Sequence, residues 1–203
     1  MPKIICIGRN YADHAKELGN DLPSEPVIFM KPDSAILPKG RPFFIPDFSK
    51  EVHYECELLI RIDRLGKRIE ERFAHKYYSQ IGLGIDFTAR DLQQNLKKKG
   101  LPWEIAKGFD GSAVIGKWVD KNGFNLKNTK FDLKQNGNQV QFGNTSDMIF
   151  PVDLLIAQIS QYFTLKIGDI IFTGTPAGVG KVNINDELVG SLEGEEMFRL
   201  RCK

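Results

Sequence analysis

The sequence is poor in the features that mark specialised classes of protein. Its three cysteines, Cys6, Cys56 and Cys202, show no CxxC or zinc-site spacing, which argues against a disulfide framework and favours a reducing compartment. It has no apolar run long enough to span a membrane or to form a secretory signal. It also lacks a charge excess, because 28 Lys and Arg residues face 26 Asp and Glu residues, so no electrostatic surface for nucleic acid or anionic lipid is expected. We predict a cytoplasmic protein with no nucleic-acid or membrane partner, with mitochondrial import as the open alternative.

Length and composition are those of an ordinary globular domain. The chain has 203 residues, of which 41% are hydrophobic and 27% charged, and it contains no repeat, low-complexity segment or linker. We therefore predict a single domain over residues 1–203 with a sizeable core.

Hydrophobic periodicity predicts many short strands and a few helices. A first short helix is expected at 10–19, with Asn10 as its cap and Gly19 as its stop. Further helices are expected at 68–78, at 88–99 with Thr88 as cap, and at 151–162 with Tyr162 on the inward face. Strands are expected at 4–8, 27–31, 52–62, 81–87, 114–119 and, after a turn, within 165–172.

The clearest local signal is a hairpin. Residues 131–135 and 138–142 alternate in polarity on either side of Asn136-Gly137, a pair typical of a type I′ turn. One face of this hairpin is apolar, so we expect it to cover a core and to carry no chemistry. A closing hairpin is expected at 185–202.

Two acidic residues interrupt the predicted strand at 52–62. Successive side chains of a strand point to opposite faces, so Glu55 and Glu57 share one face about 7 Å apart, together with His53. Two such charges repel unless a cation lies between them, and a hard divalent cation would bind their oxygens. The alternative is a solvated acidic face of an edge strand. We expect His53 to be a neighbour and not a ligand, because such a cation prefers oxygen.

A third carboxylate ends the predicted strand at 81–87. Burying an unpaired Asp86 is costly, so it requires a cation, an arginine or backbone donors. It either pairs with Arg90 or completes an oxygen site with Glu55 and Glu57.

Other charged residues allow two interpretations each. His14 and Glu17 lie three residues apart on one helical face, as a carboxylate-oriented base or as a surface pair. Lys107, among apolar neighbours, either extends to water or holds an anion. The basic run 97–99 precedes Gly100, and a solvated helix end explains it without a ligand.

The segment 173–180 is a glycine-rich loop. It lacks the Gly-Lys-Ser/Thr of a P-loop and does not follow G-x-G-x-x-G, so we reject nucleotide binding. Its hydroxyls and accessible backbone amides suit a small anion.

These motifs in this order resemble the fumarylacetoacetate hydrolase family, in particular its short single-domain members of the acylpyruvate hydrolase type. The resemblance covers essentially the whole chain, and several independent motifs make it specific. It implies a fold that is mainly β with a few helices (α+β), a mixed β-roll or β-sandwich, and a homodimer. The motifs that carry it are Ile7-Gly8-Arg9-Asn10-Tyr11, His53-Tyr54-Glu55-Cys56-Glu57, Asp86-Phe87-Thr88-Ala89-Arg90-Asp91, Lys97-Lys98-Lys99-Gly100-Leu101-Pro102-Trp103 and Thr173-Gly174-Thr175-Pro176.

The resemblance also implies roles for single residues. Its three metal ligands match Glu55, Glu57 and Asp86, with Mg²⁺ the usual ion and Mn²⁺ or Ca²⁺ as alternatives. The dyad of its hydrolytic members matches His14 and Glu17, and Lys107 matches a lysine that stabilises charge during catalysis. The positions that bind substrate match Arg9, Gln93, Lys107 and Thr175.

The expected substrate is a small 2-oxo acid. The resemblance implies hydrolysis of a C–C bond in acylpyruvates such as acetylpyruvate or fumarylpyruvate, with oxaloacetate decarboxylation as a related activity, through a Mg²⁺-stabilised pyruvate enolate. The alternative is an isomerase with the same site, either an oxaloacetate keto-enol tautomerase or a 2-hydroxyhepta-2,4-diene-1,7-dioate isomerase. A catalytically silent metal-binding module is the third reading.

Overall fold

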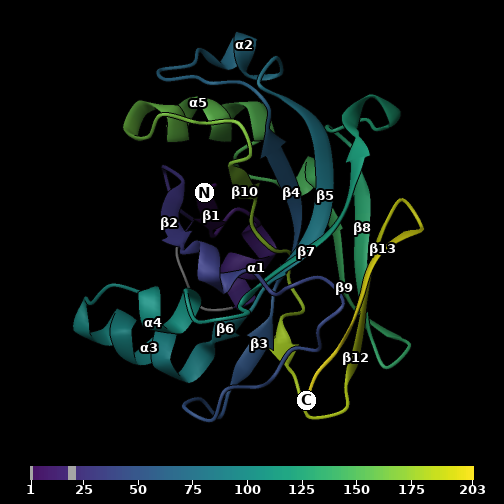
Figure 1. Ribbon diagram of the computed structural model, residues 1–203. Helices are drawn as coiled ribbons and strands as arrows, with labels where there is room; N and C mark the ends of the chain where they lie inside the picture. The colour runs from purple at the N-terminus through teal and green to yellow at the C-terminus, as the bar shows by residue number, and fades with distance from the viewer. Residues whose placement is uncertain (1, 18–21) are drawn as a thin grey trace.

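The computed structural model describes residues 2–17 and 22–203. Within them, strands in three β-sheets are the main regular structure, and the helices lie at the ends and edges of these sheets (Figure 1). The predicted α+β class, dominated by strands, is confirmed.

The central sheet has six strands in the order β2-β1-β10-β4-β5-β7. Strands β1 and β10 are parallel, and the other neighbours are antiparallel. The strands predicted from apolar runs are all present here, apart from the first part of the run at 52–62. Their bounds are β1 Ile4–Gly8, β2 Val27–Lys31, β4 Cys56–Ile62, β5 Tyr78–Asp86, β7 Ala113–Asp120 and β10 Ile170–Phe172.

Alternate residues of the central strands enter two separate cores. Leu58 and Ile60 of β4 join the larger cluster together with Ile5 of β1. Leu59 of β4 points to the other face and packs in a smaller cluster with Ile4. Because β4 is buried on both faces, its sequence is nearly continuous in apolar residues and does not alternate.

The second sheet is antiparallel, in the order β13-β12-β8-β9, and lies beside β7 and β5 at one edge of the central sheet (Figure 1). A Cβ atom at Gly116 of β7 would lie 2.8 Å from the carbonyl oxygen of Met197, so a glycine permits this close approach. The predicted type I′ hairpin is confirmed by φ angles of 53° at Asn136 and 83° at Gly137. The bounds are β8 Lys130–Gln135, β9 Asn138–Asn144, β12 Glu187–Leu192 and β13 Glu195–Arg201.

The predicted strand at 52–62 is in fact two strands that belong to different sheets. β3 (Val52–Tyr54) pairs with β6 (Thr88–Ala89) and β11 (Gly180–Lys181), whereas β4 lies in the central sheet. Glu55 is the residue between β3 and β4 and belongs to neither. The chain therefore passes from one sheet to another at the acidic motif.

Four helices lie at opposite ends of the central sheet, and α1 lies nearer its middle (Figure 1). α2 packs on α5 at one end, and α3 and α4 lie together near β6 at the other (Figure 1). The lysine run ends α3, where Gly100 has the left-handed φ of 64° that terminates a helix. The bounds are α1 Ala12–Glu17, α2 Glu71–Ala74, α3 Arg90–Lys99, α4 Glu104–Lys107 and α5 Val152–Tyr162.

Several predicted helix features are wrong. The helix expected at 68–78 is only the single turn α2, because Tyr78 already pairs in β5. Thr88 lies in β6, so the residue before α3 is Ala89, which makes no side-chain cap. Tyr162 is 62% exposed and does not face the core.

Asn10 has a different task from the predicted helix cap. Its side-chain amide donates hydrogen bonds to the carbonyl oxygens of Phe150 (3.1 Å) and Thr173 (2.7 Å), and its oxygen accepts from the Phe150 N–H (2.7 Å). It therefore joins three segments around β1. The predicted stop at Gly19 lies outside the described residues.

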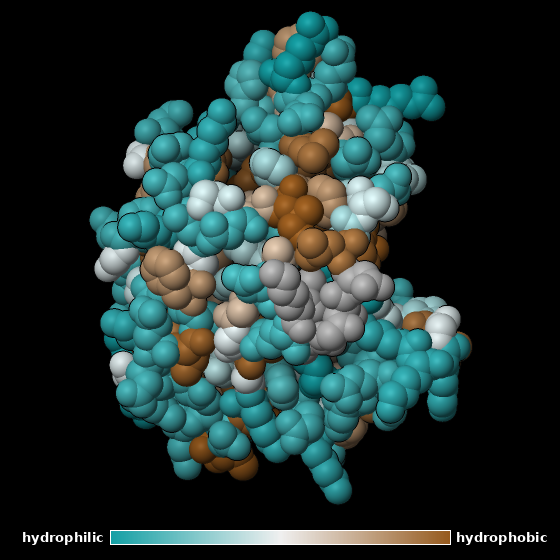
Figure 2. Space-filling view, turned by 180° about the vertical axis from the view of Figure 1, so that it is seen from behind, coloured by the Kyte–Doolittle hydropathy of each residue, from teal (hydrophilic) through white to brown (hydrophobic). Residues whose placement is uncertain are grey.

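None of the helices in residues 2–17 and 22–203 is both long and apolar enough to cross a membrane. The face in Figure 2 is mainly hydrophilic, with hydrophobic side chains gathered in separate patches.

Candidate metal centre and its base

Three carboxylates meet where β3, β4 and β5 come together. Glu57 is the second residue of β4, Asp86 is the last residue of β5, and the Asp86 N–H donates to the Glu55 carbonyl oxygen at 2.8 Å. One oxygen from each of the three side chains lies within 4.8 Å of the others, and all three are buried. The solvated acidic face considered from sequence is therefore wrong, and the predicted convergence of the three residues is confirmed.

Buried cations surround two of these carboxylates. Lys107 Nζ donates to Glu55 Oε2 (2.8 Å) and to Asp86 Oδ2 (2.7 Å), and Arg90 pairs with Glu55 Oε1. Lys31 Nζ lies 2.7 Å from Asp86 Oδ1. Asp86 thus pairs with two lysines and not with Arg90, and Lys107 is buried and does not extend to water.

Glu57 differs from its two neighbours. It accepts a hydrogen bond from the Gly174 N–H at 2.7 Å, but no ion pair joins it to any side chain that the structure describes. Burial, together with the charges of Asp86 and Glu55, raises the pKa of Glu57 well above its usual value. Burial alone would also raise the pKa of Glu55, but Lys107 and Arg90 outweigh it and lower that pKa.

The three carboxylates fit a divalent cation. The buried Asp86 Oδ1 accepts no hydrogen bond from the described residues, because its contact with Lys31 lacks hydrogen-bond alignment. Asp86 Oδ1 thus has a charged neighbour but no aligned donor, and Glu57 has no cation paired with it among the described residues. A set of three buried carboxylates is the donor chemistry that Mg²⁺, Mn²⁺ and Ca²⁺ accept. His53 is not part of the cluster, and its Nε2 lies 3.2 Å from Glu51 Oε2.

The predicted dyad lies beside the carboxylates. His14 is buried on α1, and its Nδ1 is 3.2 Å from Glu17 Oε2. The Gly178 N–H donates to Glu17 at 3.1 Å, so the glycine-rich loop holds the carboxylate that orients the imidazole. This leaves Nε2 of His14 for the pocket. Burial lowers the pKa of His14 and so favours the neutral ring, and it outweighs the opposing effect of the Glu55 charge.

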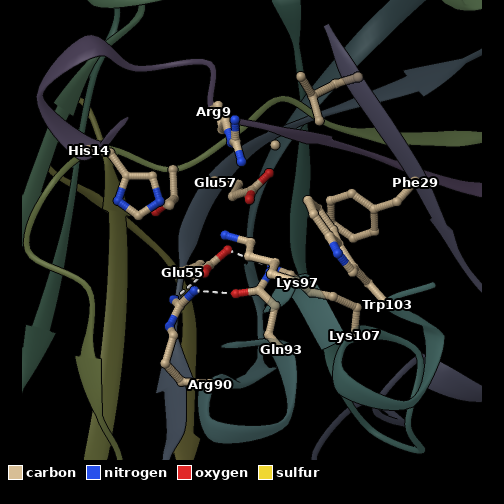
Figure 3. Close-up of a pocket in the computed structure, with 13 residues that line it drawn as sticks. Arg9, His14, Phe29, Glu55, Glu57, Arg90, Gln93, Lys97, Trp103 and Lys107 are labelled. Atoms are coloured by element: carbon tan, nitrogen blue, oxygen red, sulfur yellow. Dashed lines mark hydrogen bonds and ion pairs between the residues drawn. The ribbon is translucent and has the colours of Figure 1, made fainter. Parts of the chain in front are cut away.

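One pocket is lined by His14 together with Glu55 and Glu57. In Figure 3, His14 lies on one side and the rings of Phe29 and Trp103 on the other, with the acidic residues between them. Each of the predicted substrate-binding residues Arg9, Gln93, Lys107 and Thr175 lines it.

Besides Lys107, two of these substrate-binding candidates already have partners. Gln93 accepts from Arg90 Nη1 at 2.7 Å. The Thr175 hydroxyl donates to the Cys56 carbonyl oxygen and accepts from Gln141 Nε2, both at 2.9 Å. Gln93 therefore holds Arg90, and Thr175 holds the backbone of Cys56 between the two glutamates.

Sequence reasoning missed two buried residues of the site. Lys31 ends the apolar strand β2, and its position as the one charged residue of that run was the available signal. Gln141 of β9 accepts from the Cys56 N–H at 2.9 Å and donates to the Pro176 carbonyl oxygen at 3.0 Å. The hairpin, which was expected only to cover a core, therefore also supports the site through Gln141. Gln141 gave no signal, because its partners are more than 30 residues away.

Comparison with known sequences identifies a family for this chain. The sequence model of the fumarylacetoacetate (FAA) hydrolase C-terminal family matches residues 3–201. The chain belongs to the fumarylacetoacetate hydrolase family.

Two relatives in this family are named oxaloacetate tautomerases. The chain is 43% identical over 192 residues to oxaloacetate tautomerase FAHD1, mitochondrial, from Bos taurus, covering 94% of this chain and 87% of that protein. It is 41% identical over 199 residues to oxaloacetate tautomerase YcgM from Escherichia coli, covering 97% and 91%.

A solved relative shows the same fold with ligands. The structure of fumarylpyruvate hydrolase from Pseudomonas aeruginosa in complex with Mn²⁺ and pyruvate superposes with a TM-score of 0.93 at 33% identity, covering 100% of this chain and 89% of that one. The predicted family and fold are therefore confirmed.

Proposed function

We propose that this protein is a metal-dependent enzyme that forms the enolate of small 2-oxo acids. The observation that carries the proposal is the buried cluster of Glu55, Glu57 and Asp86 beside Lys107, with His14 in the same pocket. The expected ligands are the three carboxylates, with Mg²⁺ as the ion and Mn²⁺ or Ca²⁺ as alternatives. When bound there, the ion would polarise the 2-oxo group and stabilise negative charge on the enolate.

The side chains of the pocket supply the remaining chemistry. Lys107 has three N–H donors, and two are engaged by Glu55 and Asp86. The third N–H is available to the substrate's 2-oxo oxygen, where negative charge develops. The Arg9 guanidinium is available to a substrate carboxylate.

His14 acts as the base in this proposal. Glu17 accepts from Nδ1, which leaves the lone pair of Nε2 to take a proton, and the resulting imidazolium is stabilised by the Glu17 charge. In a tautomerase, His14 removes a proton from C3 of the keto acid, and the enolate oxygen is protonated to give the enol. In a hydrolase, His14 deprotonates a water that attacks the C4 carbonyl, the C3–C4 bond breaks, and the departing pyruvate enolate takes up a proton.

We place oxaloacetate keto-enol tautomerisation first, because the relatives at 41–43% identity carry that name. Hydrolysis of acylpyruvates is the second candidate, supported by the likeness to fumarylpyruvate hydrolase at 33% identity and by the oriented His14. Oxaloacetate decarboxylation would release CO₂ and leave the pyruvate enolate that acylpyruvate hydrolysis also forms, so we keep it as an activity related to the second candidate.

One assay series tests the proposal. The purified protein with Mg²⁺ is given oxaloacetate and, separately, acetylpyruvate, and enol, keto acid and pyruvate are followed by NMR. Interconversion of the keto and enol forms of oxaloacetate without release of pyruvate supports the tautomerase. Release of pyruvate from acetylpyruvate supports the hydrolase. His14→Ala should lower either rate by about 10² or more. Binding of Mg²⁺ with no reaction of either acid would overturn the proposal in favour of a silent metal-binding module.

We also propose that the protein works as a homodimer in a reducing compartment, with the cytoplasm as the expected one. The three cysteines are all free and buried, which suits such a compartment. The bovine relative is named as mitochondrial, so the mitochondrial alternative stays part of the proposal.

A further inference from the structure

Two cations of the pocket have no counter-ion within residues 2–17 and 22–203. Lys107 and Arg90 are paired with the carboxylates, whereas no hydrogen bond or ion pair joins Arg9 or Lys97 to any side chain that the structure describes. The Nε atom of Arg9 is buried and without a partner. Positive charge thus remains in this part of the pocket after Lys107 and Arg90 have paired with Glu55.

Arg9 is held in the pocket by an unusual backbone. Its φ of 60° is left-handed, a conformation that costs a non-glycine residue on the order of 1 kcal/mol or more and that concentrates at functional sites. The neighbouring Asn10 fixes this segment through its bonds to Phe150 and Thr173. The backbone of Arg9 is therefore fixed at the wall of the pocket, which its side chain lines.

Lys97 leaves the solvated lysine run and turns inward. It lies in the last turn of α3, where Lys98 and Lys99 are exposed, but it lines the pocket with its ammonium 5.3 Å from the centre of the Trp103 ring. Gln93, one helical turn earlier, lines the same pocket. The interpretation of this run as a solvated helix end therefore holds for two of its three lysines.

The surroundings of Lys97 are electropositive. Burial, followed by the charges of Arg9 and Arg90, lowers the pKa of Lys97 to about 8. Cations held together without a counter-ion repel one another, and an anion that binds between them relieves that repulsion. Such a preformed set is suited to a carboxylate.

We propose that Arg9 and Lys97 form a second anion subsite that binds the distal carboxylate of a dicarboxylic 2-oxo acid. The inference rests on the proposed function, in which the 2-oxo acid end of the substrate is bound by the carboxylate cluster and Lys107. A monocarboxylic acid such as acetylpyruvate has no second negative group and leaves both cations unpaired. A dicarboxylic acid engages both ends of the pocket, so Lys97 selects for substrates with two carboxylates.

Two five-carbon acids that differ only at the distal end test this subsite. 2-Oxoglutarate ends in a carboxylate and 2-oxopentanoate ends in a methyl group, and the proposed reaction cleaves neither. Their dissociation constants are measured by calorimetry at pH 7 with Mg²⁺, for the wild type, Lys97→Met and Lys98→Met. Lys98→Met is the matched control, because it removes the same charge from an exposed position of the same helix turn.

We expect the wild type and Lys98→Met to bind 2-oxoglutarate at least about tenfold more tightly than 2-oxopentanoate. Lys97→Met should reduce that ratio about tenfold, with little change for 2-oxopentanoate, and Lys97→Arg should restore it. A ratio within twofold of wild type in Lys97→Met overturns the subsite. So does an equal loss of affinity for both acids, which would place Lys97 at the 2-oxo acid end, and so does a wild type without preference.

The outcome is separate from that of the proposed function. If the wild type turns over neither oxaloacetate nor acetylpyruvate but shows the Lys97-dependent preference, the subsite stands and the proposed reaction fails. If turnover is found and the preference is absent, the reaction stands and the subsite fails. Circular dichroism of each variant checks that α3 is intact.

Discussion

At the scale of single residues, the two glutamates of the acidic motif have opposite electrostatic environments. Glu55 lies between Lys107 and Arg90, whereas Glu57 faces two other carboxylates and a backbone N–H. In the protein without metal, the charge of Glu55 stabilises the fold and the charge of Glu57 opposes it. A bound divalent cation would reverse the sign of the second effect.

This contrast predicts opposite effects of the same substitution. Without metal, Glu57→Gln should leave the melting temperature unchanged or raise it, because repulsion is removed and the amide oxygen can still accept from Gly174. Glu55→Gln should lower the free energy of unfolding by about 3–5 kcal/mol, because the buried Arg90 loses its carboxylate partner and Lys107 loses one of two. Both variants should lose the rise in melting temperature that Mg²⁺ produces in the wild type. Thermal melts with and without Mg²⁺ measure this, and a marked destabilisation of metal-free Glu57→Gln would contradict it.

The lowered pKa of His14 predicts where activity is lost in acid. A base must be neutral, and burial shifts the pKa of His14 below its usual 6.5. The neutral ring therefore persists as pH falls through 6.5, and kcat/KM should decline only below that value. The pH profile of the faster reaction found in the assay measures this midpoint. A midpoint at pH 7 or above would show that His14 is not the group that titrates.

At the scale of elements, the site lies where the strand ladder is interrupted between β3 and β4, and a distant hairpin supplies the missing hydrogen bond. Glu55 lies between β3 and β4, so its neighbour Cys56 cannot rely on one continuous ladder. Gln141 of β9 accepts from the Cys56 N–H and also binds Thr175 and Pro176. One side chain thus joins the acidic segment to the loop whose Gly174 N–H binds Glu57.

Removing this link should weaken the fold and the metal site together. Gln141→Leu leaves the buried Cys56 N–H and the Pro176 carbonyl without partners, and each such group costs about 1–3 kcal/mol. We expect a loss of unfolding free energy of that order and a weaker affinity for Mg²⁺, measured by urea unfolding and calorimetry. Gln139→Leu, on an exposed position of the same strand, is the control and should change neither. Equal effects of the two variants would remove the special role of Gln141.

At the scale of the whole molecule, the proposed homodimer has a direct test. Several large apolar side chains remain exposed on the single chain, among them Phe44, Ile167 and Ile184, each by 67% or more. Apolar surface of this kind is often covered by a partner. Light scattering after size exclusion should give twice the chain mass of 23.0 kDa at micromolar concentration. A mass of a single chain under those conditions would contradict the dimer.

The sequence by itself determined the strand-rich class, the type I′ hairpin, the end of α3 and the need of the buried acidic residues for partners, whereas the other site residues came from the resemblance to the family. The former follow from local patterns, because the pleat, the φ preferences of Asn-Gly and Gly100, and the cost of burying a carboxylate act over a few residues. The length of α2 and the split of the run at 52–62 were not predictable in this way, since pairing in β5 and β6 overrides the local preference.

Only the tertiary structure decided which charges meet. Lys31 reaches Asp86 across 55 positions of sequence and Lys107 reaches Glu55 across 52, so sheet register and helix packing set these pairs. The same packing leaves Glu57 without a cation and turns Lys97 inward while Lys98 faces solvent. Burial makes these differences matter, because an unpaired charge is far more costly in the interior than in water.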